Sequence, residues 1–297
     1  MLLQVRGVHM KKIKRKVKLI LCLILIVILG GFLYNHYLGG IIIPWGHVFH
    51  KRQVREIAVP GQHIDLYLKA AEKHNVPWEY LAAIDEVVSK YSDTKPETIE
   101  KNAQKLLGAG QNTNQMLLKE YGKDKSDQIT DIAEDYQWEA APIKEPYLFP
   151  FKREDRNKVG YSNDWGGPRS YGGKRKHEGI DLMSPKGTPL ISVTDCIVLK
   201  KGWNQLGGWR LYLQDKKYPH IFYYYAHLNN YAENIESGTA VTKGQLLGFV
   251  GDSGYGPTGT TGKFPPHLHF GIYIMSGVKF QAVNPFAFLK AWDRGVQ

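Results

Sequence analysis

The chain has 297 residues, of which 43% are hydrophobic and 23% charged, so it suits one large globular domain or two smaller ones. The formal net charge is +11, but seven cationic side chains lie in residues 1–18 without an acidic one, which leaves only +4 for the remainder. This distribution does not describe a basic globular body, so we exclude nucleic acid as a partner. The two cysteines, Cys22 and Cys196, are too far apart in sequence to indicate a disulfide framework or a thiolate cluster.

An apolar run follows the basic segment. Residues 19–34 carry no charge, and weakly polar residues extend the run to about Leu38, which is adequate for a membrane-spanning helix of ~20 residues. A buried core helix seldom follows so basic a segment, and no small-x-small cleavage site follows the run directly, as a signal peptide requires. We therefore predict a cytoplasmic tail at 1–18 and an uncleaved single-pass anchor at 19–38. By the positive-inside rule, the rest of the chain is expected outside the cell membrane.

Residues 55–138 are predicted to form a small α-helical region, because apolar residues recur there with near-helical spacing. Thr94 and Glu97 have the spacing of a capping box that opens a helix. Asp85 and Glu86 could be read as a lysozyme-like acid, but solvated or salt-bridged carboxylates are the simpler interpretation. The region then acts as a spacer, a substrate-positioning module or a regulatory cover. The helical patterns cover about 63–74, 78–88, 94–107, 115–121 and 126–138.

A proline-containing linker is predicted at 139–150, and the composition changes after it. In residues 151–297 glycines become dense and β-branched and aromatic residues dominate, so an all-β, mostly antiparallel domain is expected. Residues 252–262 form a glycine-rich loop that lacks the Lys-Ser/Thr ending of a phosphate loop, which excludes nucleotide binding. The predicted strands are Pro189–Lys200, Trp209–Gln214, His220–Ala226, Leu246–Val250 and His267–Ile274.

Five polar residues of this domain form a candidate zinc site. His177 and Asp181 are four residues apart, His267 and His269 share one face of a predicted strand, and His227 ends another. Zinc binds imidazole and carboxylate, and catalytic sites use three protein ligands with one open position. The remaining histidines can transfer protons during amide hydrolysis. Each feature alone fits surface or packing residues, but their combination in one β-rich segment favours a metal.

At these residues the chain resembles the M23 family of zinc metallopeptidases, the lysostaphin/LytM type. The resemblance covers about residues 155–290 and implies a compact antiparallel β sandwich or roll with a groove. It implies Zn²⁺ held by His177, Asp181 and His269, catalytic roles for His227 and His267, and peptidoglycan peptides as substrates. The motifs that carry it are His177 to Asp181, Tyr225 to Leu228, Gly244 to Gly251, Gly254 to Gly262 and His267 to Phe270.

Further details of the sequence suggest a branch and substrate contacts. The Trp165 to His177 segment also resembles a LytH-like branch that cuts the L-Ala–D-Glu bond in the spore cortex. We predict that Arg169, Arg175 and Tyr225 contact the substrate, since arginine pairs with carboxylates in two-point fashion. Some family members carry an upstream asparagine that fills the fourth zinc position, but no obvious equivalent is present near Asn163.

Three functions are consistent with these features. The first is a zinc-dependent endopeptidase that hydrolyses peptidoglycan stem peptides or cross-links. The second is an inactive M23-like scaffold that binds the wall or activates a partner hydrolase, and the third is a zinc hydrolase that acts on another peptide. Because all three ligand positions and both histidines are intact, we expect the active enzyme.

Overall fold

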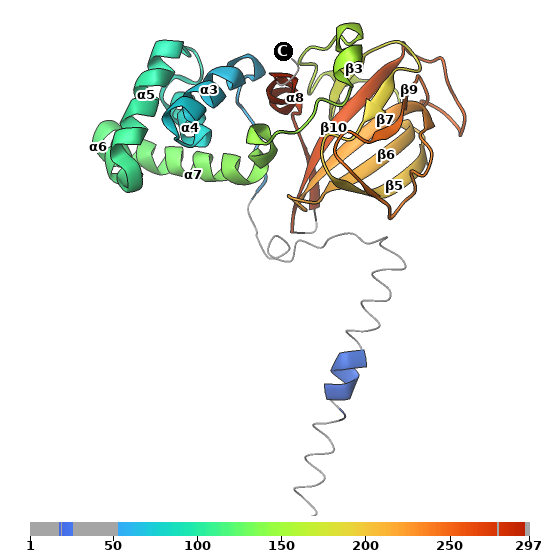
Figure 1. Cartoon of the computed structure of the whole chain (residues 1–297), viewed down its shortest axis with the longest axis horizontal. Coiled ribbons are helices and arrows are strands. Elements are labelled where there is room, and N and C mark those ends of the chain that lie inside the picture. The colour runs from blue at the N-terminus through green and yellow to red at the C-terminus, as the bar shows by residue number, and fades with distance from the viewer. Residues whose placement is uncertain (1–17, 19, 26–52, 278, 295–297) are drawn as a thin grey trace, which may run out of the picture. The chain divides into compact units, whose positions relative to one another are not determined.

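The computed structural model describes residues 18, 20–25, 53–277 and 279–294 (Figure 1). Lys18 and residues 20–25 are helical with exposed side chains. Within the described ranges, no helix is both long and apolar enough to cross a membrane. Most of the predicted anchor 19–38 and nearly all of the predicted tail lie outside those ranges, so both stay predictions. The chain divides into two compact units between Ile41 and Ile42, and residues 53–294 belong to the second.

The predicted helical region is confirmed (Figure 1). Its core is aromatic, because Tyr67, Trp78 and Tyr136 are almost fully buried and the rings of Trp78 and Tyr136 stack at 5.8 Å. Left-handed residues end the first two helices, Asn75 with φ 52° and Lys90 with φ 49°. The elements are η1 Gly61–His63, α3 Ile64–His74, α4 Trp78–Ser89, α5 Pro96–Ala109, η2 Gly110–Asn112, α6 Thr113–Tyr121 and α7 Lys123–Glu139.

The predicted capping box is wrong. Helix α5 begins with Pro96 in its first turn, and its N-cap, Lys95, makes no side-chain cap. Thr94 instead donates its hydroxyl to Asp85 Oδ2 at 2.5 Å, and Tyr67 donates to the same oxygen at 2.5 Å. Asp85 is therefore a buried, hydrogen-bonded carboxylate rather than a solvated one, because the helix core supplies hydroxyl donors.

The second of these two carboxylates, Glu86, is salt-bridged, as the sequence analysis predicts. Glu86 forms an ion pair with Arg55 and accepts a hydrogen bond from the Tyr136 hydroxyl at 2.5 Å. Neither carboxylate faces an open cleft, since both are engaged by side chains of the helical region. The salt-bridged interpretation of Glu86 is confirmed, and nothing in these contacts indicates a lysozyme-like acid.

An antiparallel sheet forms most of the C-terminal half, as the sequence predicts (Figure 1). The main path of the sheet runs β11-β10-β7-β6-β5-β8; in addition, β3 pairs with β10, and β9 pairs with β4 and β7. A separate two-stranded sheet joins β1 Pro168–Arg169 to β2 Arg175–Lys176. The other strands are β3 Ile180–Met183, β4 Pro189–Ile191, β5 Cys196–Asn204, β6 Gly208–Asp215, β7 Ile221–Tyr231, β8 Ala240–Val241, β9 Leu246–Val250, β10 His267–Ser276 and β11 Lys279–Val283.

One predicted strand is divided. The range Pro189–Lys200 contains β4 and β5, which pair with different strands. Between them Ser192 donates its hydroxyl to Thr194 O at 2.6 Å, and this local bond closes a turn that the β-rich composition does not reveal.

The sheet and the helical region meet around α8, Phe286–Asp293. Trp292 is 3% exposed and its ring lies 5.8 Å from Tyr147, 6.0 Å from Tyr223 and 6.2 Å from Phe270. Its indole N–H donates to Pro142 O at 2.9 Å. Trp292 therefore joins the core face of the sheet to the segment that follows α7.

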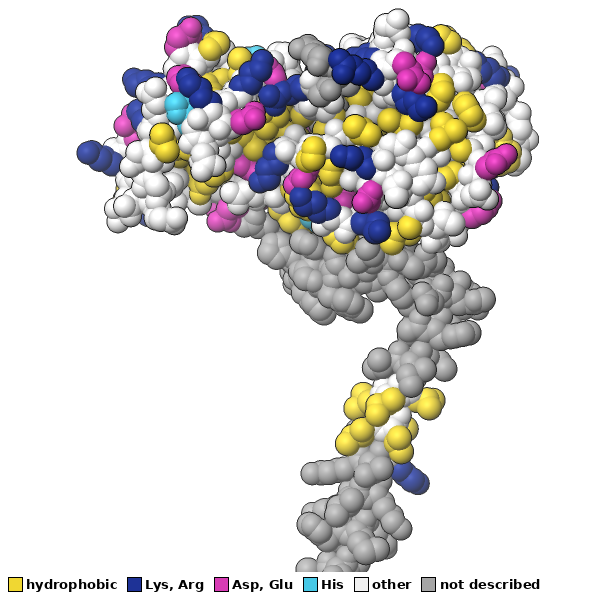
Figure 2. Space-filling view, in the orientation of Figure 1, with side chains coloured by type: hydrophobic (Ala, Val, Ile, Leu, Met, Phe, Trp, Pro, Cys, Tyr) yellow, Lys and Arg dark blue, Asp and Glu magenta, His cyan; other side chains and the backbone are white. Residues whose placement is uncertain are grey.

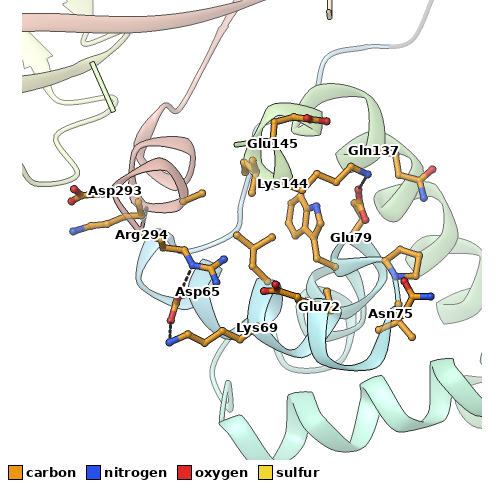
Figure 3. A pocket seen from close by; sticks show the side chains of 18 residues that line it. Asp65, Lys69, Glu72, Asn75, Glu79, Gln137, Lys144, Glu145, Asp293 and Arg294 are labelled. Carbon is orange, nitrogen blue, oxygen red and sulfur yellow. Dashed lines mark hydrogen bonds and ion pairs between the residues drawn. The ribbon is translucent and has the colours of Figure 1, made fainter. Parts of the chain in front are cut away.

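The predicted linker 139–150 is packed rather than free. Residues 140–143 are buried and include part of η3, Ala141–Lys144. Lys144 forms an ion pair with the buried Glu79 at 2.9 Å, and Arg294 forms one with Asp65. Figure 3 shows these pairs around a cavity of about 1190 Å³, which α3, η3 and the end of α8 line together.

The surface of the second unit carries both signs of charge. On the face drawn in Figure 2, acidic side chains are interspersed among the lysines and arginines, with hydrophobic side chains between them. This arrangement agrees with the sequence analysis, which placed the excess of positive charge at residues 1–18.

We expect Trp292→Ala to lower the free energy of unfolding by about 3–5 kcal/mol, because it removes a buried ring and one of the two hydrogen bonds that Pro142 O accepts. Phe280, which is 51% exposed on β11 and contacts Phe222, is the matched aromatic control, and Phe280→Ala should lower the free energy of unfolding by only about 1 kcal/mol. Urea unfolding followed by circular dichroism measures both values. A loss below about 1 kcal/mol for Trp292→Ala would contradict this account of the core.

Candidate metal centre

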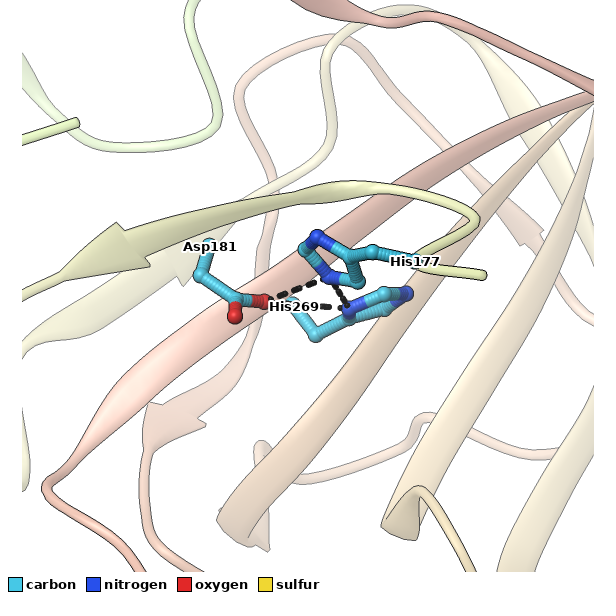
Figure 4. A group of neighbouring side chains, drawn as sticks. All are labelled: His177, Asp181 and His269. Atoms are coloured by element: carbon cyan, nitrogen blue, oxygen red, sulfur yellow. Dashed lines mark hydrogen bonds and ion pairs between the residues drawn. The ribbon is translucent and has the colours of Figure 1, made fainter. Parts of the chain in front are cut away.

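Three side chains converge on one point above the sheet (Figure 4). Strand β3 pairs with β10 so that Asp181 lies directly opposite His269, which brings their side chains together. His177 precedes β3 and reaches the same point. Its Nε2 lies 2.9 Å from His269 Nδ1 and 3.0 Å from Asp181 Oδ1, and His269 Nδ1 lies 3.1 Å from Asp181 Oδ1.

The donor set fits a tetrahedral cation. Ligand atoms about 2.0–2.1 Å from zinc in tetrahedral geometry are separated by roughly 3.3 Å, close to the three distances here. The three short contacts cannot all be hydrogen bonds. A ring nitrogen that donates to Asp181 carries a proton, so it cannot also accept a hydrogen bond from the other nitrogen. Three protein ligands also leave a fourth position open, as in catalytic zinc sites.

Gly179 makes room for this arrangement. A Cβ at this position would lie 2.6 Å from His269 Cε1 and Nε2, and 2.8 Å from Phe270 O. Any side chain there would displace the imidazole or the strand. The glycine between His177 and Asp181 is therefore required by the close approach of β10.

Asp164 and Arg169 contact the atoms of His177 and Asp181 that are not directed at the centre. His177 Nδ1 lies 3.1 Å from Asp164 O and 3.2 Å from Asp164 Oδ2, so Nδ1 donates to Asp164 and the ring directs Nε2 toward the centre. Arg169 donates to Asp181 Oδ2 at 2.8 Å and to Asp164 Oδ2 at 3.2 Å. The Arg169 guanidinium thus positions Asp181, and because it also lines the cleft, its contact with the substrate stays a prediction.

The electrostatics of the three ligands reflect their mutual contacts. Burial lowers the pKa of His177, but hydrogen bonds with Asp164 and Asp181 outweigh it and raise that pKa to about 9. Burial raises the pKa of Asp181, but hydrogen bonds with His177 and His269 hold it well below its usual range. Asp181 is thus an ionised ligand, as a metal requires.

Two further histidines border the site with fixed tautomers. His227 Nδ1 lies 2.8 Å from Ser253 O and His267 Nδ1 lies 2.8 Å from Pro265 O, so each Nδ1 must donate. Their Nε2 atoms are then free to exchange protons, and His267 Nε2 lies 3.6 Å from Asp181 Oδ1. Burial lowers the pKa of His227 well below its ordinary value, which keeps its ring neutral near pH 7.

His227 reaches the site through a β-bulge. Its φ is 64°, in the left-handed region, and β7 has one extra residue here relative to β6, where Leu228 pairs with Trp209 and Tyr225 with Leu211. The irregular backbone turns His227 out of the normal alternation of the strand. This places it with the metal ligands, 4.8 Å from His267 between ring centroids.

The predicted substrate contact at Tyr225 is wrong for the same reason. Tyr225 is fully buried, its hydroxyl donates to Ile191 O at 3.0 Å, and its ring packs against Phe270. Regular alternation would put Tyr225 on the same face as His227, but the bulge separates them. Tyr224, whose ring centroid lies 5.8 Å from that of His269, faces the site instead.

A cleft of about 520 Å³ surrounds the centre, with His177, Asp181, His227, His267 and His269 in its lining. Arg175 also lines it and donates to the Tyr255 hydroxyl at 3.2 Å, so this arginine remains a candidate for substrate contact. Asn163 accepts from Asn284 at 3.2 Å, away from the ligands. The side chain of Asn163 is therefore engaged outside the proposed metal centre.

The sequence reasoning missed Asp164 and Tyr224. For Asp164 a signal exists, because an acidic residue upstream of a metal histidine is a candidate partner for the second nitrogen of that histidine. Tyr224 belongs to a run of three tyrosines, and only the register of β7 distinguishes which one faces the cleft.

The chain combines a helical region with an antiparallel β domain whose open cleft contains a His–Asp–His donor set. These features are typical of a metal-dependent hydrolase. Residues 175–285 match the profile of peptidase family M23. A crystal structure of a candidate glycyl-glycine endopeptidase of the lytM type from Ruminococcus gnavus is 31% identical, with a TM-score of 0.58, over 81% of this chain and 90% of that one. The chain belongs to peptidase family M23.

Curated relatives include two named endopeptidases that match part of the chain. An L-Ala–D-Glu endopeptidase of Bacillus subtilis is 45% identical over 139 residues, which cover 47% of this chain and 42% of the relative. Lysostaphin of Staphylococcus simulans is 31% identical over 120 residues, which cover 40% of this chain and 22% of the relative. The chain thus spans less than half the length of these relatives.

We expect Asp164→Ala to weaken zinc binding by about 10- to 100-fold, because it removes the carboxylate that supports His177 and Arg169. Asn163→Ala is the control, since its side chain turns to Asn284. Competition with a chromophoric chelator measures both affinities. Equal affinity in the two variants would show that Asp164 does not orient the ligands.

Proposed function

We propose that the chain is a zinc-dependent endopeptidase that hydrolyses peptide bonds of peptidoglycan. The observation that carries the proposal is the convergence of His177 Nε2, Asp181 Oδ1 and His269 Nδ1, with mutual distances of 2.9–3.1 Å, beside two histidines of fixed tautomer. Membership of peptidase family M23 and the names of the relatives support the reaction and the substrate class.

Zinc is the proposed metal because the donor set is imidazole and carboxylate with an open fourth position. Bound there, Zn²⁺ supplies Lewis-acid chemistry, which acidifies water and polarises a carbonyl. His177, Asp181 and His269 hold the ion, and Arg169 and Asp164 keep Asp181 and His177 in position.

The remaining histidines move protons. Both His227 and His267 line the cleft and direct Nε2 away from the backbone, because each Nδ1 donates to a backbone carbonyl. We propose that they accept the proton of the attacking water and return one to the leaving amine. A protonated imidazole beside the reacting carbon also stabilises the oxyanion that forms there.

The finer proposal is that the bond cut is L-Ala–D-Glu. It is supported by the 45% identity to a relative of that name, against 31% for lysostaphin. Arg175 fits this choice, because its guanidinium lies in the cleft and can pair with the α-carboxylate of the D-Glu residue. A spore-cortex setting stays a prediction.

The active enzyme is preferred to an inactive scaffold. A scaffold of this fold would be expected to lack a ligand or a proton-transfer residue. Here all five residues lie in one cleft, so no observation favours the scaffold or a zinc hydrolase with another peptide substrate.

Digestion of isolated peptidoglycan by the full chain tests this function. We expect new amino termini with wild type, none with His269→Ala, and a rate lower by about 10²- to 10⁴-fold with His227→Ala. Metal analysis is the control, since His227→Ala should keep about one zinc per chain and His269→Ala should lose it. Mass spectrometry of the fragments identifies the bond. Full activity in His269→Ala, or fragments without new amines, would reject the proposal.

We also propose that residues 19–38 anchor the enzyme in the cell membrane with residues 1–18 in the cytoplasm. The support comes from the sequence alone, a basic segment followed by an uncharged run. The full chain should remain in the membrane fraction after alkaline carbonate washing, and deletion of residues 1–38 should release it. Recovery of the intact chain in the soluble fraction would reject the anchor.

A further inference from the structure

Five aromatic side chains extend from the metal centre along one face of the sheet. Tyr224 and Tyr273 line the cleft, and the ring of Tyr212 lies 6.1 Å and 5.7 Å from theirs. Phe222 is only 1% exposed; it stacks on Tyr212 at 5.6 Å and contacts Phe280 at 4.9 Å, so it supports these two rings from within. We call Tyr212, Phe222, Tyr224, Tyr273 and Phe280 the aromatic strip.

The strand register places the strip on the same face as the metal ligands. Ala226 of β7 pairs with His269, so Tyr224, two residues away, shares the face of His269 and pairs with Gly271. Farther along, Phe222 pairs with Tyr273, and Phe280 of β11 pairs with Met275. At about 3.3 Å per residue, the strip begins roughly 7 Å from His269 and ends roughly 20 Å away.

The strip is uncharged and can donate hydrogen bonds. Burial raises the pKa of Tyr224 to about 12 and also raises the pKa values of Tyr212 and Tyr273, so all three hydroxyls stay protonated. At the far end Phe280 is 51% exposed. Neutral rings that carry hydroxyl groups suit a ligand that is itself neutral and rich in hydroxyl and amide groups, although the Tyr273 hydroxyl already bonds the Glu178 carboxylate.

A sugar chain has this character. One face of a pyranose ring presents C–H bonds that pack against the negative face of an aromatic ring, while its hydroxyl and acetamido groups accept and donate hydrogen bonds. A charged peptide stem fits less well on the strip, and its carboxylates have a cation available at Arg175, beside Tyr255.

We propose that the aromatic strip binds sugar residues of the peptidoglycan glycan strand. The proposal rests on the proposed function and deepens it. In a stem peptide, L-Ala is joined through a lactyl group to N-acetylmuramic acid, so one amino acid and the lactyl group separate the L-Ala–D-Glu carbonyl from the sugar. Two extended units of ~3.5 Å place the sugar roughly 7 Å from the scissile carbon, which matches the start of the strip at Tyr224.

Titration with peptide-free glycan tests the strip without cleavage. Glycan oligomers stripped of their stems with an amidase are added to the full wild-type chain and followed by isothermal calorimetry. We expect saturable binding that Tyr212→Ala and Phe280→Ala each weaken on the order of tenfold. Leu118→Ala on α6 is the matched control, since Leu118 is 52% exposed and lies outside the strip, and it should bind as wild type does.

Cleavage of two substrates separates sugar from peptide recognition. One substrate is a stem linked to its disaccharide, and the other is the same stem without sugar. We expect Tyr212→Ala and Phe280→Ala to lower kcat/KM about tenfold for the first substrate and to leave the second unchanged.

The proposal is overturned if wild type does not bind the glycan, or if the variants lose both substrates equally, because the strip would then hold the peptide. A change from dimer to monomer in Phe280→Ala, seen by sedimentation, would also overturn it and assign the strip to a second copy of the chain. If wild type cuts neither substrate, the proposed function is rejected, and the glycan titration alone decides the role of the strip.

Discussion

The pairing of β3 with β10 is the constraint on which the site depends. Strand β3 has four residues, and its register with β10 puts Asp181 opposite His269. The same strand β10 carries His267 and pairs with β7, which carries His227. A slip of one residue between β3 and β10 would turn Asp181 to the opposite face and remove the carboxylate from the donor set. One strand therefore holds both kinds of residue, ligands and proton-transfer groups, in a fixed relation.

The backbone is irregular where the chemistry requires it. His227 adopts a φ of 64°, a conformation that costs a non-glycine residue on the order of 1–3 kcal/mol and persists when its surroundings enforce it. Here its N–H donates to Gly207 O at 2.8 Å and its Nδ1 to Ser253 O at 2.8 Å. The bulge turns an imidazole toward the cleft while Tyr225 and Leu228 remain in the core. The regular sheet thus holds the site residues in place, and the bulge in β7 brings the His227 imidazole into the cleft.

Residue type and spacing in the sequence predicted the helices and the metal site. They did not predict which of several possible partners a given side chain contacts. Helical periodicity located α3 to α7, and the histidines and Asp181 indicated a metal because few other combinations of these residues share a β-rich segment. Thr94 has the spacing of a cap, yet Asp85 is nearer in three dimensions. Arg169 suits a substrate carboxylate, and the sequence does not reveal that it also pairs with Asp181 and Asp164. Tyr225 could not be assigned to a face without knowledge of the bulge.

X-ray absorption spectroscopy of the zinc-loaded chain tests the central claim most directly. The convergence of His177, Asp181 and His269 predicts a four-coordinate ion with two imidazole nitrogens at about 2.0–2.1 Å and oxygen ligands at about 2.0–2.2 Å, without sulfur. His269→Ala should remove one imidazole from the spectrum or abolish binding. A six-coordinate oxygen shell, a sulfur ligand, or an unchanged spectrum in His269→Ala would contradict the geometry from which the function is inferred.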